Sequence, residues 1–231
     1  MRDKKSRFDI HEFFCSYVVQ HVHRNATVVD VGAGAGLCKQ VNVIRVAVGR
    51  LIGVDPNPNI YENYQVHEVM NVYFEDCTID KESVDLIYSI FVAEHIERPD
   101  VFFKKAVYIL KANGKMLFLT PNKYHYFFCL SKLADKINMK KYWIEKIMHS
   151  TVNRSYGFPT YYLINEASAV RRLADKCGFK RVQFVYIDCP EVIAIYFPKC
   201  CRWIPSFIST IMKTIKIPER YYSNFIAELT K

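Results

Sequence analysis

The sequence predicts an α/β fold in which helices cover a mainly parallel β-sheet. Short runs rich in valine, isoleucine and leucine alternate with longer stretches of helical apolar spacing, which is the order expected when helices connect parallel strands. Two of the runs, residues 84–91 and 115–120, are almost continuously apolar, as in strands that are buried on both faces. A length of 231 residues, 51% of them hydrophobic, suffices for one domain, and we expect a single domain over residues 1–231.

Each expected element ends at residues that interrupt its pattern. Asn25-Ala26 ends the first helix, and Gly178 ends the last one, for which Asn165 is the expected N-cap. Proline closes the second strand at Pro56 and the fifth at Pro121. The strands are expected at residues 27–31, 51–55, 71–74, 84–91, 115–120, 180–187 and 225–229, and the helices at residues 8–22, 37–48, 99–110 and 165–177.

The first predicted strand runs into a glycine-rich loop, residues 30–36, with the sequence Asp-Val-Gly-Ala-Gly-Ala-Gly. Glycines there allow a ligand to approach the backbone, and a helix start leaves amides free, so the loop suits a nucleoside-containing cofactor. Nicotinamide and flavin proteins use G-x-G-x-x-G at this turn, but the third glycine of that spacing falls at Leu37. Asp55 ends the second strand 19 residues after Gly36, where its carboxylate can accept hydrogen bonds from both ribose hydroxyls.

Several stretches of the chain resemble the class I S-adenosylmethionine-dependent methyltransferases, in particular the small-molecule, type 11-like members. The resemblance lies in residues 28–36, 52–56, 83–95 and 110–122, and is weaker in residues 165–179 and 225–231. It implies a Rossmann-like, seven-stranded, mostly parallel sheet with helices on both faces and an antiparallel last strand. Residues 27–122 would form the cofactor-binding core, and residues 123–164 and 189–223 would form substrate-side or lid elements.

The resemblance also implies S-adenosylmethionine as the cofactor and suggests the residues that hold it. The expected contacts come from the glycine loop and from the end of the second strand: Asp30, Gly32, Ala33, Gly34, Gly36, Asp55 and Pro56. Where relatives place an Asp-Ala pair against the adenine, this chain has Tyr73-Phe74 followed by two acidic residues. We therefore expect the adenine contact at Asp76 first and at Glu75 next.

Methyl transfer by in-line displacement depends mainly on alignment and desolvation, because the sulfonium is already an activated donor. A base helps if the acceptor is a hydroxyl, and the two candidates are His95, after the fourth strand, and His125, after the fifth. The alternative for His95 is that it caps or packs against the next helix, and the alternative for His125 is surface or core packing. The tyrosines that can line an acceptor pocket are Tyr124, Tyr161 and Tyr162, the last two in a segment that resembles a lid.

The positive charge lies outside the predicted cofactor half. Residues 25–122 contain 9 basic and 12 acidic residues, whereas residues 123–231 contain 18 basic and 8 acidic ones, a net charge of +10. Within this basic part, residues 199–213 combine apolar bulk with flanking cations, so the segment could lie on a membrane surface, wall a lipophilic acceptor pocket or simply cover the sheet. Nucleic acid is disfavoured as a substrate, because no Asn/Asp-Pro-Pro-aromatic motif is present and the basic residues are scattered.

Cysteine spacing and hydropathy suggest where the protein works. The eight cysteines include no C-x-x-C pair, which favours free thiols and no metal site. The longest uncharged apolar stretches reach about half of the roughly 20 residues that span a bilayer, and the basic first residues lack a following apolar core. We expect a cytoplasmic protein, with peripheral membrane contact left open.

The leading hypothesis is an S-adenosylmethionine-dependent methyltransferase that acts on a small or lipid-like acceptor. The first alternative is a cofactor-binding protein of the same fold without turnover, such as a membrane-associated partner subunit. A nicotinamide-dependent oxidoreductase is the third hypothesis, weakened by Leu37. The acceptor atom and the oligomeric state stay open.

Overall fold

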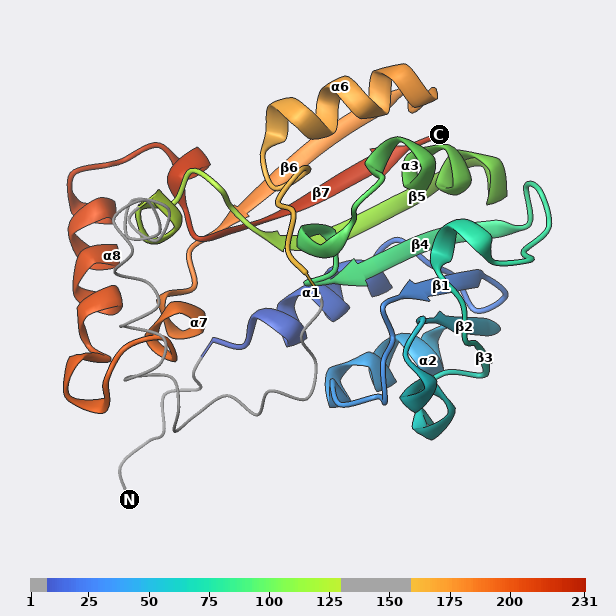
Figure 1. Cartoon of the computed structure of the whole chain (residues 1–231), viewed down its shortest axis with the longest axis horizontal. Helices are drawn as coiled ribbons and strands as arrows, with labels where there is room; N and C mark the ends of the chain where they lie inside the picture. Colours follow the sequence, from blue (N-terminus) through green and yellow to red (C-terminus); the bar gives the residue numbers. More distant parts are fainter. Residues whose placement is uncertain (1–7, 130–158) are drawn as a thin grey trace. The chain divides into compact units, whose positions relative to one another are not determined.

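The computed structural model describes residues 8–129 and 159–231 of the chain. Its centre is a seven-stranded sheet with the order β3-β2-β1-β4-β5-β7-β6 (Figure 1). The strands are β1 (Thr27–Val31), β2 (Arg50–Val54), β3 (Glu68–Met70), β4 (Val84–Ile90), β5 (Leu110–Pro121), β6 (Arg181–Ile187) and β7 (Asn224–Thr230). The buried side chains of β1, β2, β4 and β5 form the core of the sheet, as their apolar sequences predict.

Strand direction agrees with the predicted fold class. β1 pairs in parallel with both β2 and β4, and the pairs β2–β3 and β4–β5 are also parallel. β7 runs antiparallel between β5 and β6: Lys231, just after its end, donates its amide to the Gly114 carbonyl, and Lys180 donates to Thr230. The prediction of a Rossmann-like, mostly parallel sheet with an antiparallel last strand is confirmed.

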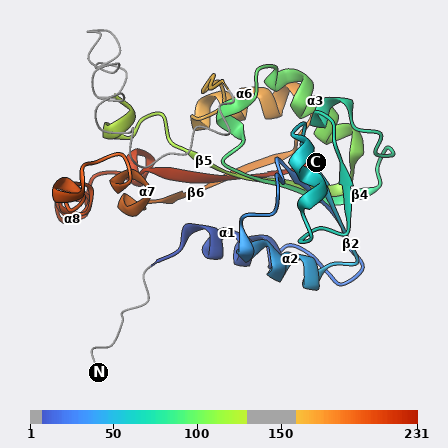
Figure 2. The same cartoon turned by 60° about the horizontal axis from the view of Figure 1, so that its bottom comes forward.

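Helices cover both faces of the sheet. Figure 2 shows α1 (Ile10–Val19) and α2 (Asn42–Ala47) on one face, and α3 (Pro99–Ile109) and α6 (Ala167–Cys177) on the other. The second predicted helix is shorter than expected, since its first part is a 3-10 turn at Lys39–Val41. Two further helices, α7 (Pro190–Ala194) and α8 (Ile204–Thr214), lie between β6 and β7 in sequence.

Two sequence predictions about local structure are wrong. The third strand lies at Glu68–Met70 instead of residues 71–74, because Phe74 begins a 3-10 turn and Tyr73 stays exposed. The N-cap of α6 is Glu166, not Asn165. Asn165 is buried and donates from Nδ2 to the Thr120 hydroxyl at 2.6 Å, so its side chain faces the core and not the helix start.

Contacts divide the chain into two compact units. The first comprises residues 1–120, 161–184 and 226–231, and the second comprises residues 121–160 and 185–225. The first unit contains the glycine loop and the second contains α7 and α8. The expected single domain over residues 1–231 stays a prediction. Within the described ranges, no helix has the length and apolarity needed to cross a bilayer.

Candidate functional site

The glycine loop leaves β1 in a backbone conformation that glycine adopts most readily. Gly32, Gly34 and Gly36 have φ angles of +76°, +48° and +72°. The Gly32 amide donates to the Val54 carbonyl at 2.8 Å, which ties the start of the loop to the end of β2. The loop therefore lies at the carboxyl edge of the parallel strands, where open α/β sheets bind ligands.

The three glycines differ in what surrounds them. A Cβ atom on Gly32 would lie 2.3 Å from Val92 Cγ2, and one on Gly36 would lie 2.5 Å from Asn63 Oδ1. These two positions lack room for a side chain because the protein itself fills the space. A Cβ on Gly34 would meet only Asp55 Oδ2, at 3.9 Å, so this part of the loop faces open space.

Asp55 lies against the loop. Its Oδ2 accepts a hydrogen bond from the Gly34 amide at 2.9 Å, and its Oδ1 accepts one from the Asn57 amide at 2.7 Å. Asn71 donates from Nδ2 to the Asp55 carbonyl at 3.0 Å, so the segment after β3 also holds this residue. The structure thus brings together two predicted parts of the cofactor site, the glycine loop and the carboxylate that ends β2.

Two side chains outside the predicted site also hold the loop. Asn63 donates from Nδ2 to the carbonyls of Ala33 and Gly34, at 3.0 and 3.1 Å, and Gln65 donates from Nε2 to the Gly36 carbonyl. Both residues follow the 3-10 turn Pro58–Glu62. No motif marks them, because side-chain bonds to a backbone about 30 residues away leave no periodic signal.

Asp30 is buried at the end of β1, below the loop. The pKa of its carboxyl is raised to about 7: burial is the main cause, the nearby Cys38 and Asp55 also raise the pKa, and the adjacent Tyr88 hydroxyl opposes them. A carboxyl group with this pKa changes charge near neutral pH. A positive ligand group beside it would favour the ionised form.

A second buried carboxylate lies beyond the ends of β4 and β5. Glu94 accepts a hydrogen bond from the Thr120 hydroxyl at 3.3 Å, and burial raises the pKa of its carboxyl group. Its backbone carbonyl accepts the amides of Tyr161 and Tyr162, at 2.7 and 3.2 Å. The backbone of two predicted acceptor-side tyrosines is therefore bonded directly to the backbone of Glu94, a residue outside the predicted site and next to the predicted His95.

The remaining predictions in the first unit lie at the ends of other strands. His95 is half-buried in the 3-10 turn after β4, with its amide donating to the Val92 carbonyl at 2.8 Å. Glu75 and Asp76 occupy the turn Phe74–Asp76 that follows β3, with Glu75 half-buried and Asp76 exposed. The roles of these three side chains stay predictions.

The second unit holds His125 and Tyr124. His125 is 1% exposed, and burial lowers its pKa to about 4, opposed by the nearby Asp188 carboxylate. Its ring is therefore neutral at physiological pH. Tyr124 is exposed, with its amide donating to Asn122 Oδ1 at 3.1 Å. Residues 130–158 of the predicted substrate-side element 123–164 lie outside the described residues.

The described part of the chain contains no cluster of three or more His, Cys, Asp or Glu residues able to hold a metal ion. What it contains is a glycine loop, a strand-ending carboxylate and a seven-stranded sheet of methyltransferase topology. This combination defines the class I methyltransferase fold. The chain belongs to the family described as "Methyltransferase domain", which matches residues 10–183. S-adenosylmethionine is the cofactor of this family.

Comparison with individual proteins agrees with the family. Over 130 residues the chain is 30% identical to a ubiquinone biosynthesis O-methyltransferase of Bradyrhizobium diazoefficiens, which covers 53% of this chain and 49% of the relative. The chain spans about half the length of the curated relatives that it matches.

Solved structures extend the likeness to nearly the whole chain. A SAM-dependent methyltransferase from Archaeoglobus fulgidus has a TM-score of 0.61 at 13% identity, covering 95% of this chain and 92% of its own. The [4+2]-cyclase SpnF has a TM-score of 0.60 at 12% identity, covering 95% and 81%. At these identities the likeness shows the fold alone.

Proposed function

We propose that this chain is a methyltransferase that transfers the methyl group of S-adenosylmethionine to a small-molecule acceptor. The observation that carries the proposal is the open side of the glycine loop at Gly34, which faces the Asp55 carboxylate in a member of the methyltransferase-domain family. The open space there suits a ligand pressed against the backbone, and the carboxylate suits a pair of ribose hydroxyls.

Each part of the site has a distinct task in this proposal. The amides of residues 32–36 and Asp55 hold the nucleoside, and Asp30 faces the positively charged end of the cofactor, where its raised pKa lets a cation shift it to the ionised form. Asp76, with Glu75 next, remains the proposed adenine contact. When bound, the cofactor would supply a methyl group on a positively charged sulfur for transfer to the acceptor, with S-adenosylhomocysteine as the other product.

An acceptor hydroxyl must also lose its proton. Glu94 is a better proton acceptor than an ordinary carboxylate, because burial raises its pKa, and the backbone at Tyr161 and Tyr162 is bonded to it. We add Glu94 to His95 and His125 as a candidate base. His125 is the weakest of the three, since its lowered pKa makes its ring a poor base.

The first acceptor class to test is a phenolic hydroxyl. The curated relatives are named as O-methyltransferases of ubiquinone biosynthesis, and they match 43% and 53% of this chain. A hydroxyl acceptor must lose a proton, and the buried Glu94, whose backbone is bonded to Tyr161 and Tyr162, could accept it.

Binding of the cofactor without methyl transfer is the second candidate function. The specific observation that favours it is the likeness to SpnF, whose name describes a cyclase on the same fold. A protein of this kind would bind S-adenosylmethionine through the same loop but would release no methylated product.

The test uses purified protein, S-adenosylmethionine labelled in its methyl group, and a panel of phenols together with a small-molecule cell extract. We expect label in a low-mass product, formed in proportion to S-adenosylhomocysteine, and much less product from an Asp55→Ala variant at the same low cofactor concentration. Saturable cofactor binding with no labelled product from any fraction would overturn methyl transfer and favour the second candidate.

The charge state of Asp30 predicts how cofactor binding depends on pH. Because the Asp30 pKa is about 7 in the free protein and a cation stabilises its ionised form, affinity should be greatest above pH 7 and fall as the carboxyl is protonated. The fall approaches about tenfold per pH unit well below the pKa. Calorimetric titration between about pH 6 and pH 8.5 measures it.

Two comparisons make the Asp30 prediction specific. The Asp30→Asn variant should bind with little pH dependence, at an affinity close to that of the wild type at low pH. S-adenosylhomocysteine, which lacks the charge on sulfur, should show a shallower pH profile than S-adenosylmethionine. Equal profiles for wild type and Asp30→Asn would refute the assignment.

A further inference from the structure

Helix α8 presents a stripe of large apolar side chains to solvent. Trp203, Phe207, Ile211 and Ile215 follow one another at intervals of four residues and are 61%, 56%, 42% and 62% exposed. Side chains at this spacing lie on one side of a helix. We call these four residues the α8 stripe. Scattered apolar residues are normal on a protein surface, but a continuous row along a helix marks an interaction site.

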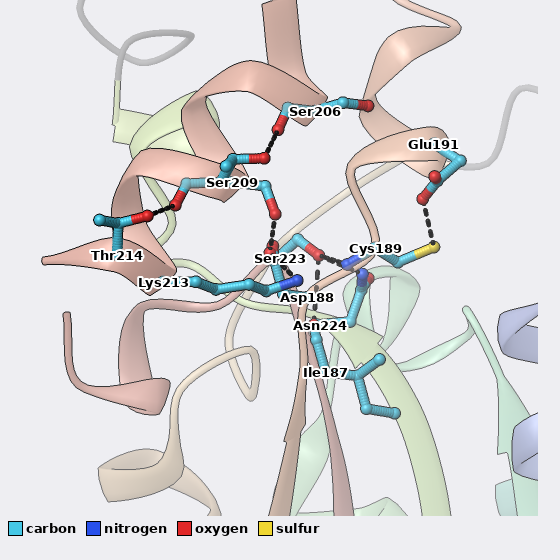
Figure 3. Close-up of polar contacts among 11 residues, drawn as sticks. Ile187, Asp188, Cys189, Glu191, Ser206, Ser209, Lys213, Thr214, Ser223 and Asn224 are labelled. Carbon is cyan, nitrogen blue, oxygen red and sulfur yellow. Dashed lines mark hydrogen bonds and ion pairs between the residues drawn. The ribbon is translucent and has the colours of Figure 1, made fainter. Parts of the chain in front are cut away.

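The opposite side of α8 is attached to the protein. Pro205 and Ser209 are its buried residues. Ser209 donates its hydroxyl hydrogen bond to Asp188 Oδ2, and the Lys213 ammonium group lies 3.2 Å from the same oxygen (Figure 3). The Asp188 side chain is only 3% exposed, so this anchor lies below the surface.

The backbone on which the anchor depends is itself fixed. Ser223, just before β7, accepts a hydrogen bond from the Cys189 amide at 2.7 Å and donates to the Ile187 carbonyl at 3.2 Å (Figure 3). These bonds hold the residues on either side of Asp188. Since Asp188 holds one side of α8, the helix cannot turn its stripe inward without breaking the contacts of the buried Asp188 carboxylate with Ser209 and Lys213.

The α8 segment itself carries only positive charges. Residues 199–218 contain four cations, Lys199, Arg202, Lys213 and Lys216, and no aspartate or glutamate. Lys199, Lys213 and Lys216 are exposed. Lys213 is paired with the buried Asp188. Within the part of the chain that the structure describes, Lys199, Arg202 and Lys216 therefore carry the unpaired positive charge of the segment. An apolar helix face flanked by such cations complements a surface that is both apolar and negatively charged, and an anionic phospholipid bilayer has both properties.

We infer that α8 is a docking surface for anionic membranes, in which the α8 stripe enters the headgroup region and the neighbouring lysines meet lipid phosphates. Tryptophan and phenylalanine favour this region of a bilayer, and long lysine side chains reach back from it to water. The inference goes beyond the proposed methyl transfer and can fail or succeed independently of it. Membrane binding would account for the positive charge of the second unit, which the cofactor site does not explain.

The test measures co-sedimentation of the full chain with vesicles of phosphatidylcholine alone and of phosphatidylcholine mixed with phosphatidylglycerol. We expect binding to the mixed vesicles only, weakened by added salt. The double variant Phe207→Ser/Ile211→Ser should reduce the bound fraction at least about tenfold, since it removes two of the four apolar side chains. The double variant Lys199→Gln/Lys216→Gln should remove the preference for phosphatidylglycerol.

A control variant replaces an even more exposed apolar side chain elsewhere. Val46 on α2 is 79% exposed, and Val46→Ser should leave vesicle binding unchanged. Circular dichroism and the melting temperature of every variant confirm that it is folded. Trp203 fluorescence gives a direct readout in a Trp143→Phe background, where it is the sole tryptophan: its emission should shift to the blue on mixed vesicles.

Three outcomes would overturn the inference. They are no sedimentation of the wild type with mixed vesicles, an equal loss of binding in Val46→Ser, and a vesicle-bound protein whose Trp203 emission is unchanged. A stripe variant that lowers the mass measured by light scattering, with no vesicle binding by the wild type, would instead assign the stripe to a second copy of the chain.

Discussion

Asp55→Ala should weaken S-adenosylmethionine binding by roughly a hundredfold or more, the largest effect expected for a single side chain of this protein. The carboxylate can accept two hydrogen bonds from the ribose, and each bond to a charged acceptor contributes about 1.5–3 kcal/mol. Its removal also frees the Gly34 amide, which now donates to Asp55 Oδ2 at 2.9 Å. Isothermal titration of wild type and variant measures the change in affinity.

Asp85→Ala is the matched control for that loss. Asp85 lies near the start of β4, accepts the Thr27 amide at 2.8 Å and pairs with Lys111 at 2.8 Å. Its replacement removes comparable bonds at the amino ends of the strands, away from the loop. We expect a lower melting temperature and an unchanged cofactor affinity. If Asp55→Ala binds the cofactor as well as Asp85→Ala does, Asp55 is not the ribose ligand.

Gly34→Ala should fold and yet lose cofactor affinity by about ten- to a hundredfold. The added methyl group meets no protein atom closer than 3.9 Å, so the free protein accommodates it at the cost of a left-handed alanine, about 1–2 kcal/mol. The same methyl group occupies the space into which the cofactor would come, and overfilling a packed contact costs typically 1–3 kcal/mol. Titration and thermal melting separate the two effects.

Gly178→Ala shows what the backbone strain alone does. Gly178 ends α6 with a φ of +97°, and a Cβ there meets nothing within 4 Å. The variant should lose a similar amount of stability to Gly34→Ala and keep full cofactor affinity. An affinity loss shared by both variants would point to global destabilisation, and unchanged binding in Gly34→Ala would remove the loop from the proposed site.

The fold was predictable where strands are long and buried on both faces. β4 and β5 show near-continuous apolar runs, and both were located to within a few residues at their carboxyl ends. β3 was misplaced because it has only three residues and begins with the exposed Glu68. The aromatic residues after it, Tyr73 and Phe74, are typical of a strand in sequence. In the structure they lie at the start of a 3-10 turn, where Phe74 is buried and Tyr73 is exposed.

The candidate site contains residues that were predictable from the sequence and residues that were not. Residues that belong to a compact motif, the loop glycines and Asp55, are predicted by their spacing and lie together in the structure. Asn63 and Gln65 were missed, because their contacts join segments that only the folded sheet brings close. Glu94 is adjacent to the predicted His95 but was not predicted. Its suitability as a base depends on burial, which raises the pKa of its carboxyl group and which the sequence does not show.

The bonds that Asn63, Gln65 and Asp55 make to the glycine loop determine how the loop meets its ligand. Four of these side-chain hydrogen bonds fix the backbone from Ala33 to Gly36 in the free protein. A loop already held in one shape has little conformational entropy left to lose, so association need not wait for it to order. Preorganisation of this kind makes the glycine loop a rigid receptor, and it leaves the adjustments of the catalytic cycle to other parts of the chain.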